Sequence, residues 1–340
     1  MNTPFPAALL ATTMTIIAAT SAVAQGELNL YSSRHYDTDE RLYSDFEDAT
    51  GITINRIEGK SDELLARIQA EGVNSPADVF LTADTSRLER AKNAGVLQAI
   101  DSAVLESRIP AYLRDDDNQW FGFSQRARIF FYDRNDVATP PATYADLADP
   151  KYRGLVCIRS SSNTYNQTLL AAIITHEGEA AATRWAQGVV DNMARAPQGG
   201  DTDQMRGIVS GECEIAVGNT YYFARTARKQ VRGVSENRDM IGWVFPSQNG
   251  FGAHMNLSGG GVAAHAPNRA NAIRFLEYLA SDSAQEYFSA GNDEYPAVPG
   301  VALAPSIAAL GFFKPDDVSL SAVAKNIPAA QKIFNQVGWE

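Results

Sequence analysis

The sequence predicts an α/β protein that consists of two βα lobes with a ligand cleft between them. Strand-like and helix-like segments alternate along the chain, and the middle of the chain repeats the alternation of its first third. Alternation at this spacing is typical of βαβ units and predicts a mostly parallel sheet. The chain has 340 residues, of which 45% are hydrophobic and 20% charged, so it is long and apolar enough for two globular domains.

The first lobe is expected to contain three strands, each followed by a helix. The expected strands cover residues 27–31, 51–57 and 77–81. In the first helix, Leu42 and Phe46 lie four residues apart on one face, and Gly51 marks the helix end. Ser61 is expected to be the N-cap of the second helix, and the third helix should stop at Gly95.

The middle of the chain predicts a second set of strands and helices. Strands are expected at 129–132, 155–158, 215–217 and 242–245. Helices are expected at 167–176, 180–193, 203–210 and from Thr220 onward. Glycine-rich stretches at 249–252 and 258–261 are interpreted as the chain crossing between the domains, and a long helix is expected from Arg269 to Ala290.

This organisation predicts a discontinuous N-terminal lobe of residues 25–123 and 250–340, with residues 124–249 forming the C-terminal lobe. Two βα domains, one interrupted by the other, are typical of clamshell-type binding proteins. Ligands of open α/β sheets lie at the carboxyl ends of the strands, so the strand-to-helix loops are where a site is expected.

The first 24 residues have the pattern of a secretory signal peptide. They contain no Asp, Glu, Lys or Arg, and their apolar run ends at Ala22-Val23-Ala24, with cleavage expected after Ala24. A basic residue near the start is missing. A membrane anchor is the alternative, but Pro4 and Pro6 and several hydroxyl residues make the run weak for a span of ~20 residues. We therefore expect a soluble protein exported to the periplasm.

The net charge and the motif content argue against a nucleic-acid-binding protein, an enzyme, and a zinc or copper protein. The chain has 40 acidic and 29 basic residues, a net charge of -11, so it repels nucleic acid as a whole. The sequence has no Walker, G-x-S-x-G or H-E-x-x-H motif, which disfavours an enzyme. Zinc and copper sites need His and Cys, yet these residues lie in unrelated segments.

The two cysteines, Cys157 and Cys213, lie in or beside expected strands. In an oxidising compartment they can form one disulfide, whose long loop would stabilise the fold by roughly 4 kcal/mol in the chain-entropy model. Two separate buried thiols are the alternative.

Four tyrosines lie in three of the expected strand-to-helix loops: Tyr36, Tyr165, Tyr221 and Tyr222. Two neighbouring side chains on a helix point about 100° apart, so Tyr221 and Tyr222 can reach one point only near the helix N-terminus, where they fall. Helix N-termini favour negative charge, which suits a phenolate. The ordinary alternative for a loop tyrosine is a half-buried ring with its hydroxyl in water.

Three motifs surround these tyrosines, at Leu30–Asp39, Gly154–Tyr165 and Val217–Arg225. Together they resemble the periplasmic ferric-iron-binding proteins of ABC transporters, and in particular the cyanobacterial-type iron-uptake subgroup with an all-tyrosine site. The resemblance extends over the chain after the first 24 residues, including Ser258–Val262 and residues 292–299. It implies a periplasmic binding protein of type II, a monomer that captures Fe(III) between its lobes and delivers it to an ABC permease in the inner membrane.

By this resemblance the iron ligands are Tyr36, Tyr165, Tyr221 and Tyr222, with a contribution from His35 as in other members. Arg225 and Arg126 are placed near the site. The alternative for Arg225 is a surface arginine on a basic helix, and for His35 a loop histidine in solvent.

The chemistry of iron supports the same ligand set independently. Fe(III) is a hard, highly charged ion, and phenolate is the hardest strongly basic oxygen donor among the side chains. A free tyrosine has a pKa near 10, so binding must expel protons. Four phenolates on Fe(III) leave a formal charge of about -1, which Arg225 can neutralise. A second hypothesis for the same fold is capture of an anion at the helix start at 160–162.

Overall fold

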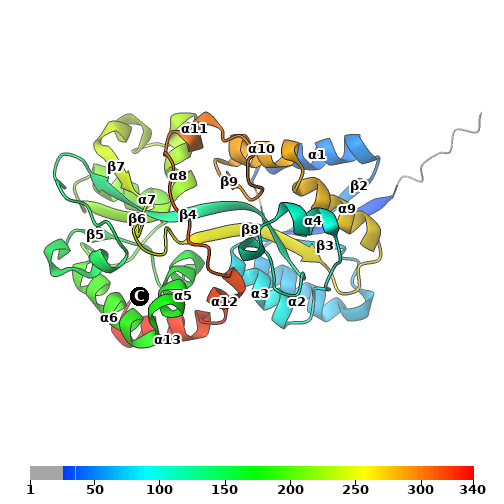
Figure 1. The fold of residues 1–340 in the computed structure, drawn as a ribbon, viewed down its shortest axis with the longest axis horizontal. Helices are drawn as coiled ribbons and strands as arrows, with labels where there is room; N and C mark the ends of the chain where they lie inside the picture. The colour runs from blue at the N-terminus through cyan, green and yellow to red at the C-terminus, as the bar shows by residue number, and fades with distance from the viewer. Residues whose placement is uncertain (1–25, 35) are drawn as a thin grey trace, which may run out of the picture.

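The structure, a computed structural model, describes residues 26–34 and 36–340. Figure 1 shows two lobes side by side, joined by long strands that run through the middle of the molecule. Within the described residues the strands form one nine-stranded sheet in the order β2-β1-β3-β8-β4-β6-β5, and β7 and β9 both pair with β4. The expected α/β architecture with two lobes is confirmed.

The N-terminal lobe contains three parallel strands, as the sequence predicts, and β5 and β6 of the C-terminal lobe are also parallel. β1 (Glu27–Ser32) pairs in parallel with β2 (Thr53–Glu58) and with β3 (Val79–Ala83). The helices that follow are α1 (Asp39–Thr50), α2 (Ser61–Glu71), α3 (Thr85–Asn93) and α4 (Ala103–Arg108). Ser61 is the first residue of α2 and forms no side-chain cap, so its expected role as N-cap is wrong.

Two long strands connect the lobes, and they explain why the expectation of a mostly parallel sheet is wrong. β4 (Phe121–Asp133) leads into the C-terminal lobe, and β8 (Met255–Val262) returns beside it in the opposite direction. β8 also pairs antiparallel with β3, and β4 pairs antiparallel with its other neighbours. Because β4 leads out of the N-terminal lobe and β8 returns to it within the same sheet, these two strands are antiparallel.

The glycines of β8 are required by the close approach of neighbouring strands. A Cβ atom added at Gly261 would lie 2.2 Å from the backbone oxygen of Gln119, and one at Gly259 would lie 2.3 Å from that of Phe121. This glycine-rich stretch is therefore a strand of the sheet that joins β3 to β4.

The C-terminal lobe places helices around a shorter part of the sheet. Its strands are β5 (Val156–Cys157), β6 (Ile215–Asn219) and β7 (Ile241–Val244). Its helices are α5 (Thr164–Glu177), α6 (Glu179–Asn192), α7 (Asp201–Val209) and α8 (Thr220–Ala224). The last of these begins where the sequence analysis expected it.

The final part of the chain is mainly helical. It contains α9 (Arg269–Leu279), α10 (Asp282–Asn292), β9 (Tyr295–Pro296), α11 (Pro305–Ala308), α12 (Leu320–Ala324) and α13 (Ile327–Val337). The single helix expected from Arg269 to Ala290 is wrong, because Ser281 interrupts it. Its hydroxyl accepts a hydrogen bond from the backbone N–H of Ala284 and starts a second helix.

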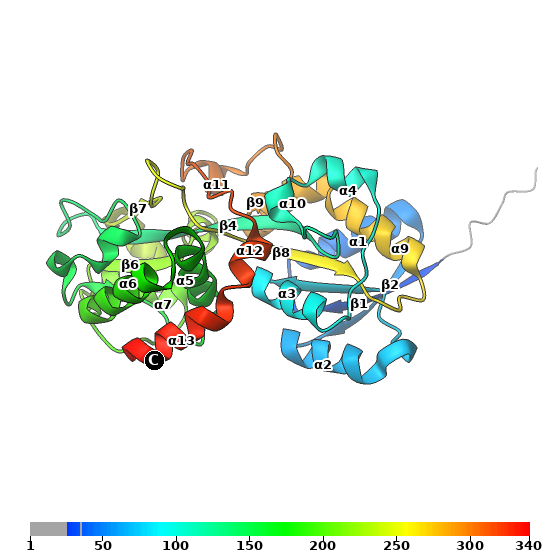
Figure 2. The same ribbon diagram turned by 60° about the horizontal axis from the view of Figure 1, so that its bottom comes forward.

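The hydrophobic cores show where these last helices pack. α13 contacts α5 and α6 (Figure 2). Phe334 and Trp339 lie in one hydrophobic cluster with Trp185. Ile307 and Leu310, in and after α11, belong to another cluster of the same lobe. We propose that the C-terminal lobe includes α11 and α13 in addition to residues 124–249, rather than leaving all of 250–340 to the other lobe.

Further expectations from the sequence concern the disulfide, membrane-spanning helices and the signal peptide. Cys157 and Cys213 form a disulfide in the structure, with 56 residues of sequence separation, so the bonded alternative is confirmed. Within residues 26–34 and 36–340, no helix combines the length and apolar character needed to cross a membrane. The signal peptide expected at 1–24 lies outside the described residues.

Candidate metal centre

The four tyrosines come from three loops in two different lobes. Tyr36 lies between β1 and α1 in the N-terminal lobe. Tyr165 is the second residue of α5, and Tyr221 and Tyr222 follow β6 in the first turn of α8. All four therefore lie at strand-to-helix connections, as the sequence analysis expected.

The structure brings these side chains together. The hydroxyl oxygens of Tyr165 and Tyr221 are 3.3 Å apart, and the rings of Tyr221 and Tyr222 stack with centroids 4.3 Å apart. Tyr36, from the other lobe, lies near enough to Tyr165 and Tyr221 that an ionised Tyr165 would raise its pKa and an ionised Tyr36 would raise the pKa of Tyr221. The three tyrosines of the C-terminal lobe thus lie together, and Tyr36 approaches them from the N-terminal lobe.

Local hydrogen bonds explain how the C-terminal tyrosines are presented. Asn163 caps α5, and its side chain accepts a hydrogen bond from the backbone N–H of Tyr165 at 3.2 Å. β6 ends at Asn219, after which the chain turns directly into α8. The N-terminal turns of both helices therefore point their tyrosines toward the same place.

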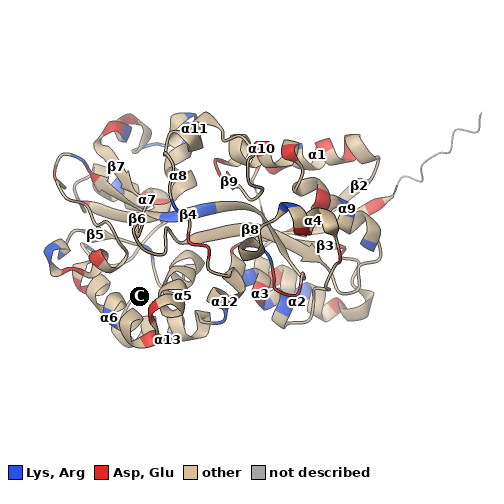
Figure 3. Cartoon of the chain, viewed as in Figure 1, with Lys and Arg blue, Asp and Glu red and all other residues tan. Residues whose placement is uncertain are grey.

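Arginines surround the tyrosine cluster. The guanidinium of Arg225 lies 4.9 Å from the ring centroid of Tyr221 and 5.0 Å from that of Tyr222. Arg126 lies 5.8 Å from the ring of Tyr165 and 6.0 Å from that of Tyr221. Figure 3 shows basic residues on β4 where this strand passes between the lobes. The expected positions of Arg225 and Arg126 beside the tyrosines agree with this arrangement.

Three further arginines lie beside the cluster, and the sequence analysis missed them. Arg34 lies 4.9 Å from the ring of Tyr36, whereas Arg128 and Arg159 lie 5.8 and 5.7 Å from that of Tyr165. Arg126 and Arg128 share a face of β4, but the strand expected from the sequence began at residue 129 and included neither of them. Arg159 directly precedes the serine-rich helix start that the sequence analysis singled out.

Buried carboxylates balance part of this positive charge. Asp39 and Glu294 both pair with Arg34, and the second carboxylate also lies 3.5 Å from Arg126. Asp201 accepts hydrogen bonds from Arg128 at 2.8 Å and Arg159 at 3.2 Å. Asp39 lies three residues after Tyr36, inside the first motif, whereas Asp201 and Glu294 lie at least 20 residues from each of the four tyrosines and no local pattern marks them.

Burial makes three of the tyrosines harder to deprotonate. It raises the pKa of Tyr36, and the nearby charges of Glu294 and Tyr165 raise that pKa further. Burial also raises the pKa of Tyr221 and Tyr222, to which the neighbouring phenols and, for Tyr222, Asp201 add. These three side chains are therefore phenols at neutral pH unless a cation displaces their protons.

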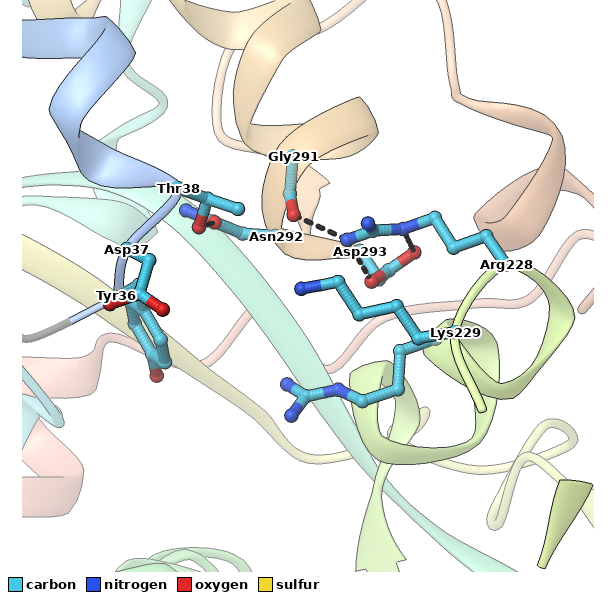
Figure 4. Close-up of a pocket in the computed structure, with 9 residues that line it drawn as sticks. Tyr36, Asp37, Thr38, Arg228, Lys229, Gly291, Asn292 and Asp293 are labelled. Atoms are coloured by element: carbon cyan, nitrogen blue, oxygen red, sulfur yellow. Dashed lines mark hydrogen bonds and ion pairs between the residues drawn. The ribbon is translucent and has the colours of Figure 1, made fainter. Parts of the chain in front are cut away.

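A cavity of about 200 Å³ opens beside Tyr36 at the boundary of the lobes. Figure 4 shows Lys229 extending into it from one lobe, with Tyr36 and Asp37 on the opposite side. The guanidinium of Arg228 is held away by Asp293, to which its Nε donates at 2.8 Å. Of the four tyrosines, Tyr36 lines this cavity, together with Arg225 from the C-terminal lobe.

Two other expectations concern residues near this site. His35 lies outside the described residues, so its contribution stays a prediction. At the serine-rich helix start, the backbone N–H of Ser161 donates at 3.0 Å to the backbone carbonyl of Glu340. Since this donor is already used by the end of the chain, the structure gives no support to an anion site there.

Comparison with known proteins identifies the family. A sequence model described as bacterial extracellular solute-binding protein matches residues 74–309. This chain belongs to the bacterial extracellular solute-binding proteins.

Relatives of this solute-binding protein carry names that refer to iron. Iron uptake protein A1 of Synechocystis is 47% identical over 317 residues, which cover 93% of this chain and 88% of the relative. The major ferric iron-binding protein of Neisseria meningitidis is 27% identical over 100% of both chains. The solved structure of Trichodesmium IdiA (FutA), in complex with iron and citrate ligands, has a TM-score of 0.89 and 49% identity, covering 93% of this chain and 100% of that chain. The resemblance seen in the sequence and the expected two-lobed type II fold are confirmed.

Proposed function

We propose that this solute-binding protein captures one Fe(III) between its lobes through the phenolates of Tyr36, Tyr165, Tyr221 and Tyr222, and delivers it to an ABC permease for iron uptake. The observation that carries the proposal is the convergence of these tyrosines, with the hydroxyls of Tyr165 and Tyr221 3.3 Å apart. The names of its relatives, which refer to iron uptake and ferric iron binding, agree with it.

The donor set suits this ion. Phenolate is a hard oxygen donor, and a highly charged ion can displace the protons of buried phenols by replacing each O–H with an Fe–O bond. Four phenolates on Fe(III) leave a formal charge of about -1, and the positive charge of Arg225, which lies over the rings of Tyr221 and Tyr222 and donates from Nε to the backbone oxygen of Tyr221, can offset it. Iron is the cargo in this scheme, and the protein performs no reaction on it.

The distribution of the ligands supports a capture mechanism. Tyr165, Tyr221 and Tyr222 come from the C-terminal lobe, whereas Tyr36 comes from the N-terminal lobe. An ion bound by all four joins the lobes, and this would couple iron occupancy to lobe closure, which a permease can recognise. The signal peptide expected at 1–24 and the disulfide between Cys157 and Cys213 suit a periplasmic protein, which we propose to act as a monomer.

The direct test is titration of the iron-free protein with chelated Fe(III). We expect one iron per chain by elemental analysis and a red to orange colour from tyrosinate-to-iron charge transfer. Replacing Tyr221 and Tyr222 by Phe should remove most of this absorbance and weaken binding. Tyr152→Phe is the matched control, because the Tyr152 hydroxyl is bonded to the backbone oxygen of Thr139 instead. A colourless, iron-free wild type would refute the proposal.

A further inference from the structure

Arg128 is a buried arginine at the start of the C-terminal lobe, on the strand that leads out of the other lobe. Its side chain is 2% exposed. One terminal nitrogen donates to Asp201 at 2.8 Å and to Asn219 at 3.2 Å, and the other donates to Asn166 at 2.8 Å. A planar guanidinium fixes the directions of these bonds, so it holds all three acceptors in a defined arrangement.

The acceptors lie beside the tyrosines. Asn166 directly follows Tyr165, and Asn219 is the last residue of β6, two positions before Tyr221. Arg128 therefore connects the first turn of α5 with the first turn of α8, although the two are more than fifty residues apart in sequence.

Further hydrogen bonds hold Asn166 and Asp201, two of the acceptors of Arg128, in place. The amide nitrogen of Asn166 donates to the backbone oxygens of Arg159 and Ser160, at 2.7 and 3.2 Å. Asp201 accepts a hydrogen bond from the backbone N–H of Asn219 at 2.7 Å. The side chain of Arg128 is thus the common donor of a network that includes both tyrosine loops and the start of α7.

The backbone of Arg128 is itself fixed. Its N–H donates to the backbone oxygen of His254 at 2.9 Å, and its carbonyl accepts from the hydroxyl of Tyr144 at 2.6 Å. That hydroxyl in turn accepts a hydrogen bond from the N–H of His254 at 2.8 Å. The guanidinium therefore projects from a rigid part of the lobe.

The charge of Arg128 has a local partner. Asp201 is fully buried and pairs with both Arg128 and Arg159, so one carboxylate is shared by two guanidiniums. The guanidinium of Arg225 lies over the rings of Tyr221 and Tyr222. Arg128 lies 5.8 Å from the ring of Tyr165, but its terminal nitrogens donate to Asp201, Asn219 and Asn166, so it acts on the tyrosines by fixing their loops.

We propose that Arg128 is a positioning residue for iron capture, which holds Tyr165, Tyr221 and Tyr222 assembled in the C-terminal lobe before iron arrives. This inference rests on the proposed function. Preassembly removes the entropy cost of ordering separate ligand side chains at the moment of binding. Partners that orient metal ligands typically change metal affinity by about 10- to 100-fold when they are removed.

The test measures iron affinity, by competition with a chelator, in full-length Arg128→Gln and Arg128→Lys proteins. Both should bind iron about 10- to 100-fold more weakly, because neither side chain can donate to three acceptors in one plane. Arg195→Gln is the matched control, because Arg195 is also nearly buried but bonds Glu212 and Gln204. It should keep wild-type affinity.

Double-mutant cycles separate positioning from general destabilisation. The effect of Arg128→Gln should be smaller when Tyr165 is already Phe, because one of the ligands that Arg128 positions is gone. In a Tyr36→Phe background the effect should be unchanged, since Tyr36 belongs to the other lobe. Equal effects in both backgrounds, or wild-type affinity of the Arg128 variants, would overturn the inference.

A second variant serves if the Arg128 variants do not fold. Asn166→Ala removes the bond from Arg128 beside Tyr165 and the two bonds that the Asn166 amide donates to Arg159 and Ser160, and it leaves the bonds of Arg128 to Asp201 and Asn219. It should weaken iron binding and couple to Tyr165→Phe but not to Tyr36→Phe. The absence of that coupling would also overturn the inference. Failure of the proposed function is distinguishable, because then the wild type itself takes up no iron.

Discussion

At the scale of single residues, the proposed iron capture requires the removal of protons from buried phenols. Burial raises the pKa of Tyr36, Tyr221 and Tyr222 above the ordinary value of about 10. At neutral pH the iron-free site therefore holds protons that Fe(III) must displace. Since a raised pKa favours the protonated form, acid favours the iron-free protein and alkali favours the iron-bound one.

We expect iron binding to release up to about four protons per ion, one for each tyrosine that becomes a ligand. The measurement is base uptake at constant pH, with the protons contributed by the iron chelate subtracted. Tyr222→Phe should lower the proton count by about one. An iron-bound protein whose affinity does not change between pH 5 and 8 would contradict phenolate ligation.

The residue scale also shows how far sequence reasoning extends. The tyrosines were predictable because each follows a strand signal and precedes a helix signal. Arg128, Asp201 and Glu294 were not, because their contacts join positions far apart in the chain, such as Arg128 with Asp201 and Arg126 with Glu294. A buried ion pair between distant segments leaves no local pattern.

At the scale of elements, the disulfide joins β5 to the residues just before β6. It closes a loop with 56 residues of sequence separation that contains α5, α6 and α7. Cys157 is fully buried and Cys213 nearly so, within one hydrophobic cluster. The bond therefore fixes the lobe that supplies three of the four tyrosines.

Replacing both cysteines by Ser should lower the free energy of unfolding by roughly 4 kcal/mol, because the unfolded chain regains the loop entropy. The measurement is urea unfolding of the iron-free protein. The iron-bound visible spectrum should stay the same in the variant that remains folded, since neither cysteine is an iron ligand. A changed spectrum would indicate that the disulfide shapes the site directly.

The ends of helices and strands also show which features a short stretch of sequence can predict. Gly51 ends α1 and takes a left-handed conformation with φ of 69°, as its position in the sequence indicated. The break at Ser281 was missed because helical periodicity continues across it. β4 was found only in part, because its first half is buried between other strands and lacks a clear alternation.

At the scale of the whole molecule, the site joins two lobes that have separate cores. The hydrophobic cluster containing Leu28 and Phe46 belongs to the N-terminal lobe, and two others belong mainly to the C-terminal lobe. β4 and β8 cross between the lobes, and Tyr36 is the one proposed tyrosine ligand from the N-terminal side. Iron should therefore favour the closed arrangement through Tyr36.

Tyr36→Phe should leave an iron-binding half-site in the C-terminal lobe. We expect the variant to keep a coloured iron complex. Its iron affinity should fall by more than about 10- to 100-fold, which is the loss typical of removing a residue that only orients a ligand. In X-ray scattering, iron should reduce the radius of gyration of the wild type and leave that of the variant nearly unchanged. Equal compaction of both proteins would show that Tyr36 does not link the lobes.

The central claim is that tyrosinates bind the iron, and resonance Raman spectroscopy tests it most directly. With excitation in the visible band of the iron-loaded protein, the account predicts enhanced vibrations of iron-bound tyrosinate, which should weaken in Tyr221→Phe and Tyr222→Phe and persist in Tyr152→Phe. Iron present at one ion per chain without any tyrosinate vibration would contradict the account.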